Sequence, residues 1–176
     1  MTATICCKQY FASLTLPTPC AASHWQRHHK LIFIALAVFS GFLCLKNMWV
    51  AEDAFITLRT VEQFLHGNGF RWNPHDRTQV YTSPLWFLCI IATTVFSKTL
   101  YLDLVVLSVL LHIALLGIMA RCLPSCRHWV ATVLLLSLSQ AFFEFTGSGL
   151  EYPLAYCLLA ISVLLYVRHR PTEDCY

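Results

Sequence analysis

The sequence contains few charged residues, and this scarcity excludes most classes of soluble protein. Only 12% of its 176 residues are Asp, Glu, Lys or Arg, against roughly 25% in soluble domains. Disordered chains, collagen and coiled coils need polar or repetitive sequence, which is also lacking. With 57% hydrophobic residues and a mean hydropathy of +0.61, the composition indicates an all-α integral membrane protein. The net charge of +3 is too small to indicate a nucleic-acid partner.

The nine cysteines do not indicate a disulfide framework. Their number is odd, and Cys44, Cys89 and Cys157 lie inside apolar runs, where cysteine behaves as a small hydrophobic residue. We therefore expect mostly free thiols. Cys122, Cys126 and His128 match no common zinc spacing, so we predict no metal site there and leave dependence on a divalent metal open.

Long apolar stretches predict the membrane topology. They cover residues 31–45 (a full span if continued to 50), 84–96, 100–120, 129–143 and 152–167. If all five crossed the membrane, the basic clusters at Arg27, Arg121 and Arg168 would not all face the cytoplasm, against the positive-inside rule. They do so if 84–96 lies along or dips into the outer face without crossing the membrane, a role that its length permits. We therefore predict about four transmembrane helices plus outer-face juxtamembrane helices.

This topology divides the chain into regions. Residues 1–30 are expected to form an irregular cytoplasmic tail, 31–168 the transmembrane region, and 169–176 a second cytoplasmic tail. The first outer loop, 51–99, holds most of the polar residues that separate membrane segments.

The outer loop is predicted to begin with an amphipathic helix over residues 52–66. Phe55, Leu58 and Leu65 mark its apolar face. The glycines of Gly67-Asn68-Gly69 end it, and a short extended piece over 70–73 follows.

An acidic pair, Glu52 and Asp53, stands at the outer end of the first predicted span. Adjacent acids at a membrane are costly unless they are solvated or used. The alternative is that they stabilise the N-terminus of the following helix. From the dipeptide alone, this second interpretation is the more common.

Four motifs around and after this pair favour a functional role for the two acids over a purely structural one. They occur in the order Trp49-Val50-Ala51-Glu52-Asp53-Ala54-Phe55-Ile56-Thr57-Leu58-Arg59, Gly67-Asn68-Gly69-Phe70-Arg71-Trp72-Asn73-Pro74, Tyr81-Thr82-Ser83-Pro84-Leu85-Trp86 and Gly147-Ser148-Gly149-Leu150-Glu151-Tyr152-Pro153-Leu154. Over about residues 47–168 this set resembles bacterial membrane glycosyltransferases of the GT-C superfamily, in particular the group of the mycobacterial terminal β-arabinofuranosyltransferase. Residues 1–30 match no part of it.

The resemblance implies sugar transfer at the outer face of the bacterial cytoplasmic membrane. The donor would be a polyprenyl-phosphate sugar, and the acceptor a hydroxyl of an envelope glycan, lipid or protein. The implied catalytic base is one of the two acids; we favour Asp53 and leave Glu52 open. A base is needed because a sugar hydroxyl is a poor nucleophile.

The same resemblance suggests substrate-binding residues. Arg59 is expected to hold the lipid phosphate, and Arg71 is a weaker candidate. Tyr81 and Trp86 are expected to stack on a sugar or line the prenyl path, although such residues as often form an aromatic interface belt. Glu151 is expected to face the same cavity as Asp53.

Members of the superfamily are several-fold longer than this chain. We therefore expect it to correspond to the N-terminal portion of such an enzyme, with a downstream-encoded second half as a possible partner, and leave open whether it is active alone. The alternative is a non-enzymatic membrane protein: an inactive homologue, a scaffold or a transporter-like subunit. The charged residues gather at one surface, and neither broken helices nor inverted repeats, which transporters often show, are evident.

Overall fold

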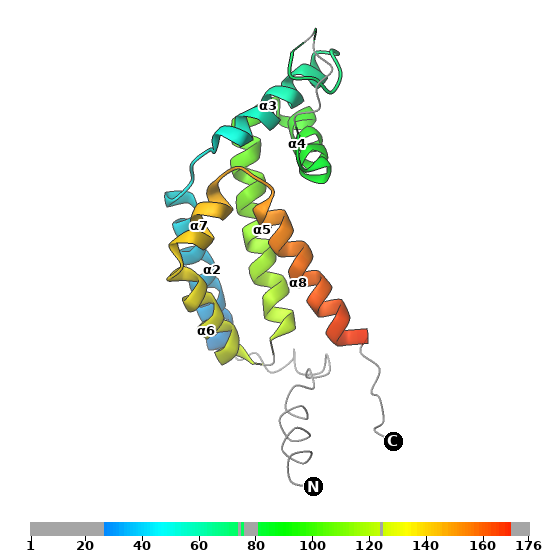
Figure 1. Cartoon of the computed structure of the whole chain (residues 1–176). Coiled ribbons are helices and arrows are strands. Elements are labelled where there is room, and N and C mark those ends of the chain that lie inside the picture. The colour runs from blue at the N-terminus through cyan, green and yellow to red at the C-terminus, as the bar shows by residue number, and fades with distance from the viewer. Residues whose placement is uncertain (1–26, 74, 76–80, 124, 170–176) are drawn as a thin grey trace.

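The computed structural model describes residues 27–73, 75, 81–123 and 125–169, and every regular element in these ranges is a helix. The helices are α2 (Arg27–Lys46), α3 (Glu52–Leu65), α4 (Pro84–Ser97), α5 (Leu100–Cys122), α6 (Cys126–Ser137), α7 (Gln140–Gly147) and α8 (Tyr152–His169) (Figure 1). The prediction of an all-α chain is confirmed. Most of the predicted 1–30 and 169–176 tails lie outside the described residues.

The first predicted span is helical, but over a shifted range. Instead of continuing to Val50, α2 ends at Lys46 and reaches 20 residues because it begins at Arg27. The backbone N–H groups of Trp49 and Ala51 donate to carbonyls near residue 147 rather than to the preceding turn. Because these two N–H groups find acceptors outside the helix, they do not extend the hydrogen-bond pattern of α2, and the helix ends.

The predicted stretch over 129–143 is two helices, not one. α6 and α7 meet at a bend of 77°. The break lies at Leu138 and Ser139, where the Ser139 side chain accepts a hydrogen bond from the N–H of Phe142 at 3.3 Å and caps α7. A serine that bonds to the backbone in this way favours a helix N-terminus over a helix interior.

The long helices run side by side, and the two short helices α3 and α4 pack against each other at one end (Figure 1). Leu58 and Val61 of α3 bury against Trp86 and Ile90 of α4, and Leu104 of α5 completes this core. α4, which begins at Pro84, therefore packs against α3. A second core, around Leu116, Trp129 and Val133, joins α5 to α6 near the other end.

One described helix, α5, is long and apolar enough to cross a membrane by itself, and the bent α6–α7 pair would be a second if it counts as one span. α4 and residues 152–166 of α8 are shorter apolar helices. Many large apolar side chains of the long helices are exposed, among them Leu31, Val38, Phe42, Leu110 and Leu159. The number of membrane spans stays a prediction.

The two ends of the bundle carry different charges. The N-termini of α2 and α6 and the C-terminus of α5 lie at one end (Figure 1), which we call the basic end because Lys30, Arg121 and Arg127 stand there. α3 and the start of α8 lie at the opposite, acidic end, with Glu52, Asp53 and Glu151. Two lysines, Lys46 and Lys98, also lie toward the acidic end. Between the ends, a buried hydrogen bond of 2.9 Å joins Ser40 of α2 to His112 of α5.

Candidate functional site

The candidate site is built on a backbone contact between two segments far apart in the sequence. The N–H of Trp49 donates to the carbonyl of Gly147 at 3.0 Å, and the N–H of Ala51 donates to the carbonyl of Ser148 at 2.9 Å. These bonds hold the first turn of α3, which carries the acidic pair, against the loop between α7 and α8. Two of the four sequence motifs therefore meet.

The glycines of the fourth motif, Gly147 and Gly149, allow this close approach. A Cβ atom on Gly147 would lie 2.9 Å from the carbonyl oxygen of Asn47, which belongs to a backbone that cannot rotate away. Gly149 has φ +77°, and a Cβ there would lie 2.6 Å from Leu104 and 3.3 Å from the Cβ of Ala54. Glycine fits both positions because it has no Cβ and tolerates positive φ.

A third motif reaches the same loop through Trp86. Its indole N–H donates to the carbonyl of Gly149 at 3.2 Å, and the side chain is only 1% exposed. Trp86 thus lies inside the packed protein, between α4 and the loop, and its hydrogen-bond donor is used within the chain. In this position it holds the Gly149 loop in place.

The two acids of the pair remain accessible. Glu52 and Asp53 occupy the first turn of α3, both are exposed, and the helix is preceded by Ala51, which provides no side-chain cap. Among the described residues the one ion pair joins Arg59 to Glu62, so neither acid of the pair is neutralised there. Both carboxylates are free to accept a proton or a hydrogen bond from a ligand.

Glu151 lies at the same end of the bundle as the acidic pair. It is half-buried and directly precedes α8, and its carbonyl accepts the first hydrogen bond of that helix from Ala155 at 2.9 Å. The loop that carries Glu151 is the loop held by Trp49, Ala51 and Trp86. The structure therefore places Glu151, the acidic pair and Trp86 on segments that contact one another.

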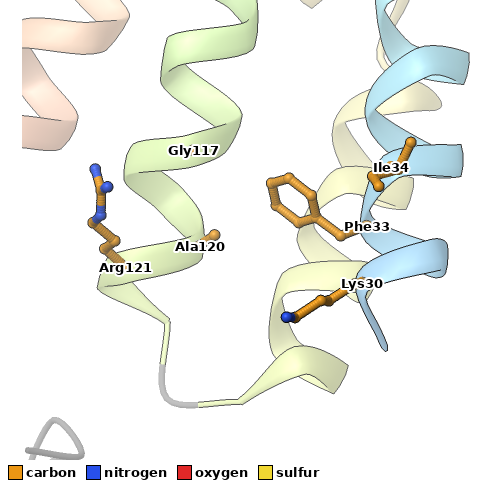
Figure 2. Close-up of a pocket in the computed structure, with 6 residues that line it drawn as sticks. All are labelled: Lys30, Phe33, Ile34, Gly117, Ala120 and Arg121. Carbon is orange, nitrogen blue, oxygen red and sulfur yellow. The ribbon is translucent and has the colours of Figure 1, made fainter. Parts of the chain in front are cut away.

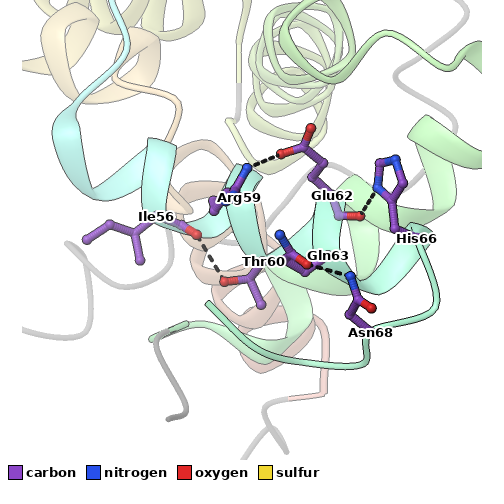
Figure 3. Close-up of polar contacts among 7 residues, drawn as sticks. All are labelled: Ile56, Arg59, Thr60, Glu62, Gln63, His66 and Asn68. Carbon is purple, nitrogen blue, oxygen red and sulfur yellow. Dashed lines mark hydrogen bonds and ion pairs between the residues drawn. The ribbon is translucent and has the colours of Figure 1, made fainter. Parts of the chain in front are cut away.

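Arg59 lies farther along α3, on an exposed face. Its guanidinium is 3.0 Å from the Glu62 carboxylate (Figure 3). Exposed pairs of this kind contribute at most about 1 kcal/mol, so Glu62 holds the Arg59 guanidinium only weakly.

The predicted end of α3 is confirmed, with a turn after it rather than an extended piece. Gly67 and Gly69 have φ +81° and +79°, and the Asn68 side chain donates to Gln63 at 2.7 Å (Figure 3). Bends follow at residues 70, 72 and 73, and Phe70 stacks on Phe64 with ring centroids 4.6 Å apart.

The apolar face of α3 differs in part from its prediction. Leu58 is buried, but Phe55 and Leu65 are 54% and 41% exposed. The core-facing positions are instead Ala54, Leu58 and Val61, which follow a helical spacing of four and three residues.

Arg71 and Tyr81 lie toward the C-terminal end of α3, which is about 20 Å long. The Tyr81 ring stacks on Phe87 at 4.7 Å and meets the edge of Phe70. Arg71 is half-buried in the turn after Gly69. Tyr81 also packs against the core cluster that contains Trp86.

Sequence reasoning missed the residues that join the acidic pair to the glycine loop. The carbonyls of Gly147 and Ser148 do this through the backbone, and the Trp49 indole adds a hydrogen bond to the carbonyl of Glu144 at 3.2 Å. The spacing Gly147-Ser148-Gly149 was the one available signal, since paired glycines often mark a close backbone approach.

Comparison with known proteins relates the chain to glycosyltransferases. It is similar to the terminal β-(1→2)-arabinofuranosyltransferase of Corynebacterium glutamicum, with 29% identity over 173 residues, covering 90% of this chain and 25% of that protein. It is also similar to the terminal β-(1→2)-arabinofuranosyltransferase of Mycobacterium tuberculosis, with 29% identity over 99 residues, covering 56% of this chain and 16% of that protein. The chain spans a quarter or less of the length of these relatives. No family model and no solved structure matches it.

Proposed function

We propose that this chain forms the acceptor-activating part of a membrane glycosyltransferase. The observation that carries the proposal is the meeting of three motifs at one end of the bundle: the turn with Glu52 and Asp53, the Trp86 indole, and the Gly147–Glu151 loop. The similarity to two arabinofuranosyltransferases supports sugar transfer as the reaction class. Unpaired, exposed carboxylates on a rigid support are suited to general-base catalysis.

In the proposed reaction, Asp53 accepts the proton of an acceptor hydroxyl as its oxygen attacks the anomeric carbon of the donor sugar. The bond from that carbon to the phosphate oxygen breaks, and polyprenyl phosphate leaves with an additional negative charge. Arg59 exchanges Glu62 for this phosphate and stabilises the charge. Glu52 is adjacent to Asp53 and is the alternative base.

The proposed location is a multi-pass position in the cytoplasmic membrane of a bacterium, with the acidic end outside. The exposed apolar side chains of α2, α5 and α8 support burial in lipid, since such a surface in water is a liability. Lys30, Arg121 and Arg127 at the opposite end support a cytoplasmic position for that end. The envelope glycan, lipid or protein acceptor would then approach α3 from outside.

The complete activity is proposed to need a further polypeptide segment. The matched regions cover 25% and 16% of the two relatives, so additional parts of the donor site would come from sequence beyond this chain. Membranes are therefore prepared with the 176-residue chain alone and with any downstream-encoded segment co-produced. A labelled polyprenyl-phosphate sugar serves as the donor.

The test compares three single variants in the active preparation. Asp53→Asn removes the base at almost unchanged size and is expected to slow transfer by about 10²–10⁴-fold. Glu52→Gln reports on the alternative base. Glu144→Gln is the matched control, because it removes an exposed carboxylate that bonds to Gln140 rather than one of the pair.

Each outcome has a defined meaning. If Glu52→Gln slows transfer and Asp53→Asn does not, the two roles are exchanged. If neither variant slows an active preparation, the pair is structural and the mechanism is wrong. If no donor is used in any preparation, the chain is a non-enzymatic membrane protein and the proposal fails.

A further inference from the structure

A second candidate site lies at the basic end, away from the acidic pair. An open cavity of about 430 Å³ separates the first turns of α2 from the last turns of α5. Lys30, Phe33 and Ile34 line it from α2, and Gly117, Ala120 and Arg121 line it from α5 (Figure 2). This volume falls within the range of about 300–1,000 Å³ that is usual for ligand pockets.

The lining combines an apolar floor with one cation that faces it, Lys30, and a second cation at its edge, Arg121. Phe33, Ile34 and Ala120 offer only carbon atoms of their side chains. Lys30 extends from α2 toward α5, whereas the Arg121 side chain projects from the side of α5 that faces away from α2 (Figure 2). Neither Lys30 nor Arg121 has an ion-pair partner among the described residues, and no described carboxylate lies at this end. Within the described part of the chain, positive charge thus stands beside an apolar surface without a carboxylate partner.

Gly117 leaves the floor of this pocket empty. No heavy atom lies within 4 Å of the position that its Cβ would take. The wall beside it is well packed: Phe33 contacts Trp129 with ring centroids 4.4 Å apart, and the Trp129 indole donates to the carbonyl of Leu116 at 3.1 Å. These contacts join α2 and α5 to α6, so the space beside Gly117 stays open between α2 and α5.

We propose that this pocket binds an anionic phospholipid from the leaflet at the basic end. The phosphate lies beside Lys30 and is attracted more weakly by Arg121 at the edge of the pocket, and an acyl chain lies along Phe33, Ile34 and the open face of Gly117. A free phosphate would leave the apolar floor uncovered, whereas a lipid covers both parts. Basic pockets between transmembrane helices are suited to acidic headgroups.

This inference goes beyond sugar transfer and does not depend on it. It requires that α2 and α5 lie in a bilayer, and its residues are at the opposite end from Glu52 and Asp53. Loss of lipid binding and loss of sugar transfer are therefore separate results.

The charge test uses the purified full chain in a neutral detergent. Native mass spectrometry measures the binding of dioleoylphosphatidylglycerol and of dioleoylphosphatidylcholine, which has no net charge. The double variant Lys30→Gln/Arg121→Gln is expected to weaken phosphatidylglycerol binding by between about fivefold and about 25-fold, at about fivefold for Lys30 and less for Arg121. The control Lys46→Gln/Lys98→Gln removes the same charge at the acidic end and should bind like the parent.

The space test fills the pocket without changing its charge. Gly117→Leu is expected to weaken phosphatidylglycerol binding at least tenfold while its thermal midpoint is maintained, because the new side chain occupies open space. Gly41→Leu is the matched control, since Gly41 also lies in a helix with nothing within 4 Å of its Cβ position but does not line the pocket.

Three results would overturn the proposal. The first is equal binding of the two lipids by the parent chain. The second is equal weakening by the two charge-removing pairs, which would indicate a general effect of net charge. The third is unchanged binding in Gly117→Leu, which would place the lipid outside the pocket.

Discussion

The acidic and basic ends of the bundle differ in how they use glycine. At the acidic end, Gly147 and Gly149 are buried against backbone and side chains, and the space that a Cβ would need is already occupied. At the basic end, Gly117 faces open space. The tight packing at the acidic end suits a site that must hold a carboxylate in place. The open space at the basic end suits a site that a ligand fills. At the acidic end, atoms of the chain itself fill the space beside the glycines. At the basic end, the space beside Gly117 is unfilled.

The largest expected difference between the acidic and the basic end is the side of the membrane that each one faces. In a chain whose own cysteines are replaced, Lys98→Cys is expected to react with an impermeant maleimide added from outside, and Ser125→Cys is expected to be protected. The reason is that α4 lies beside α3 at the acidic end and Ser125 precedes α6 at the basic end. Labelling of Lys98→Cys from the cytoplasmic side alone would mean that α4 crosses the membrane.

A methyl group added to a glycine at the acidic end should reduce the stability of the protein strongly. Gly149→Ala is expected to lower the free energy of unfolding by about 2–4 kcal/mol, from the cost of positive φ for a non-glycine residue and from overpacking against Leu104. Thermal unfolding of the purified protein in detergent measures this.

Gly41→Ala serves as the control for that substitution, because its Cβ would meet no atom within 4 Å. Alanine is the better helix former, so the control should be neutral or slightly stabilising. Equal effects of the two substitutions would show that the loop around Gly149 is not closely packed.

Trp86→Phe is expected to have an intermediate effect. It keeps an aromatic ring but leaves the buried carbonyl of Gly149 without its donor, which costs about 1–3 kcal/mol. Trp49→Phe is the comparison, because the Trp49 indole bonds to a carbonyl at an exposed position. If Trp49→Phe lowers the unfolding midpoint as much as Trp86→Phe, the buried hydrogen bond is not what holds the loop.

The smallest change in stability is expected at Arg59. Removal of its exposed ion pair in Arg59→Ala should cost at most about 1 kcal/mol, while donor use should decrease because the leaving phosphate loses its cation. Glu62→Gln breaks the same pair but keeps Arg59, so donor use should be unchanged or improved. If the two variants reduce sugar transfer equally, the ion pair itself matters and Arg59 is not the phosphate ligand.

The positions of α3, α4, α5 and α8 could be predicted from the sequence to within a few residues. Pro84 begins α4 as its fixed φ favours, and Gly67 ends α3. These features depend on neighbours in the chain. The order of motifs likewise pointed to the acidic pair and to Glu151 without a structure.

Only the tertiary structure showed why α2 ends at Lys46 and where the acidic pair is held. Hydrogen bonds from residues 49 and 51 to 147 and 148 join segments nearly one hundred residues apart, and no local pattern encodes such a pairing. The burial of Trp86, the exposure of Phe55 and the open space at Gly117 likewise depend on which helices lie next to each other. The amino-acid sequence by itself determined α3, α4, α5 and α8 and the polar residues at their ends, because those follow from local propensity and hydrophobicity. The packing of distant segments determined the end of α2 and the arrangement of the candidate site.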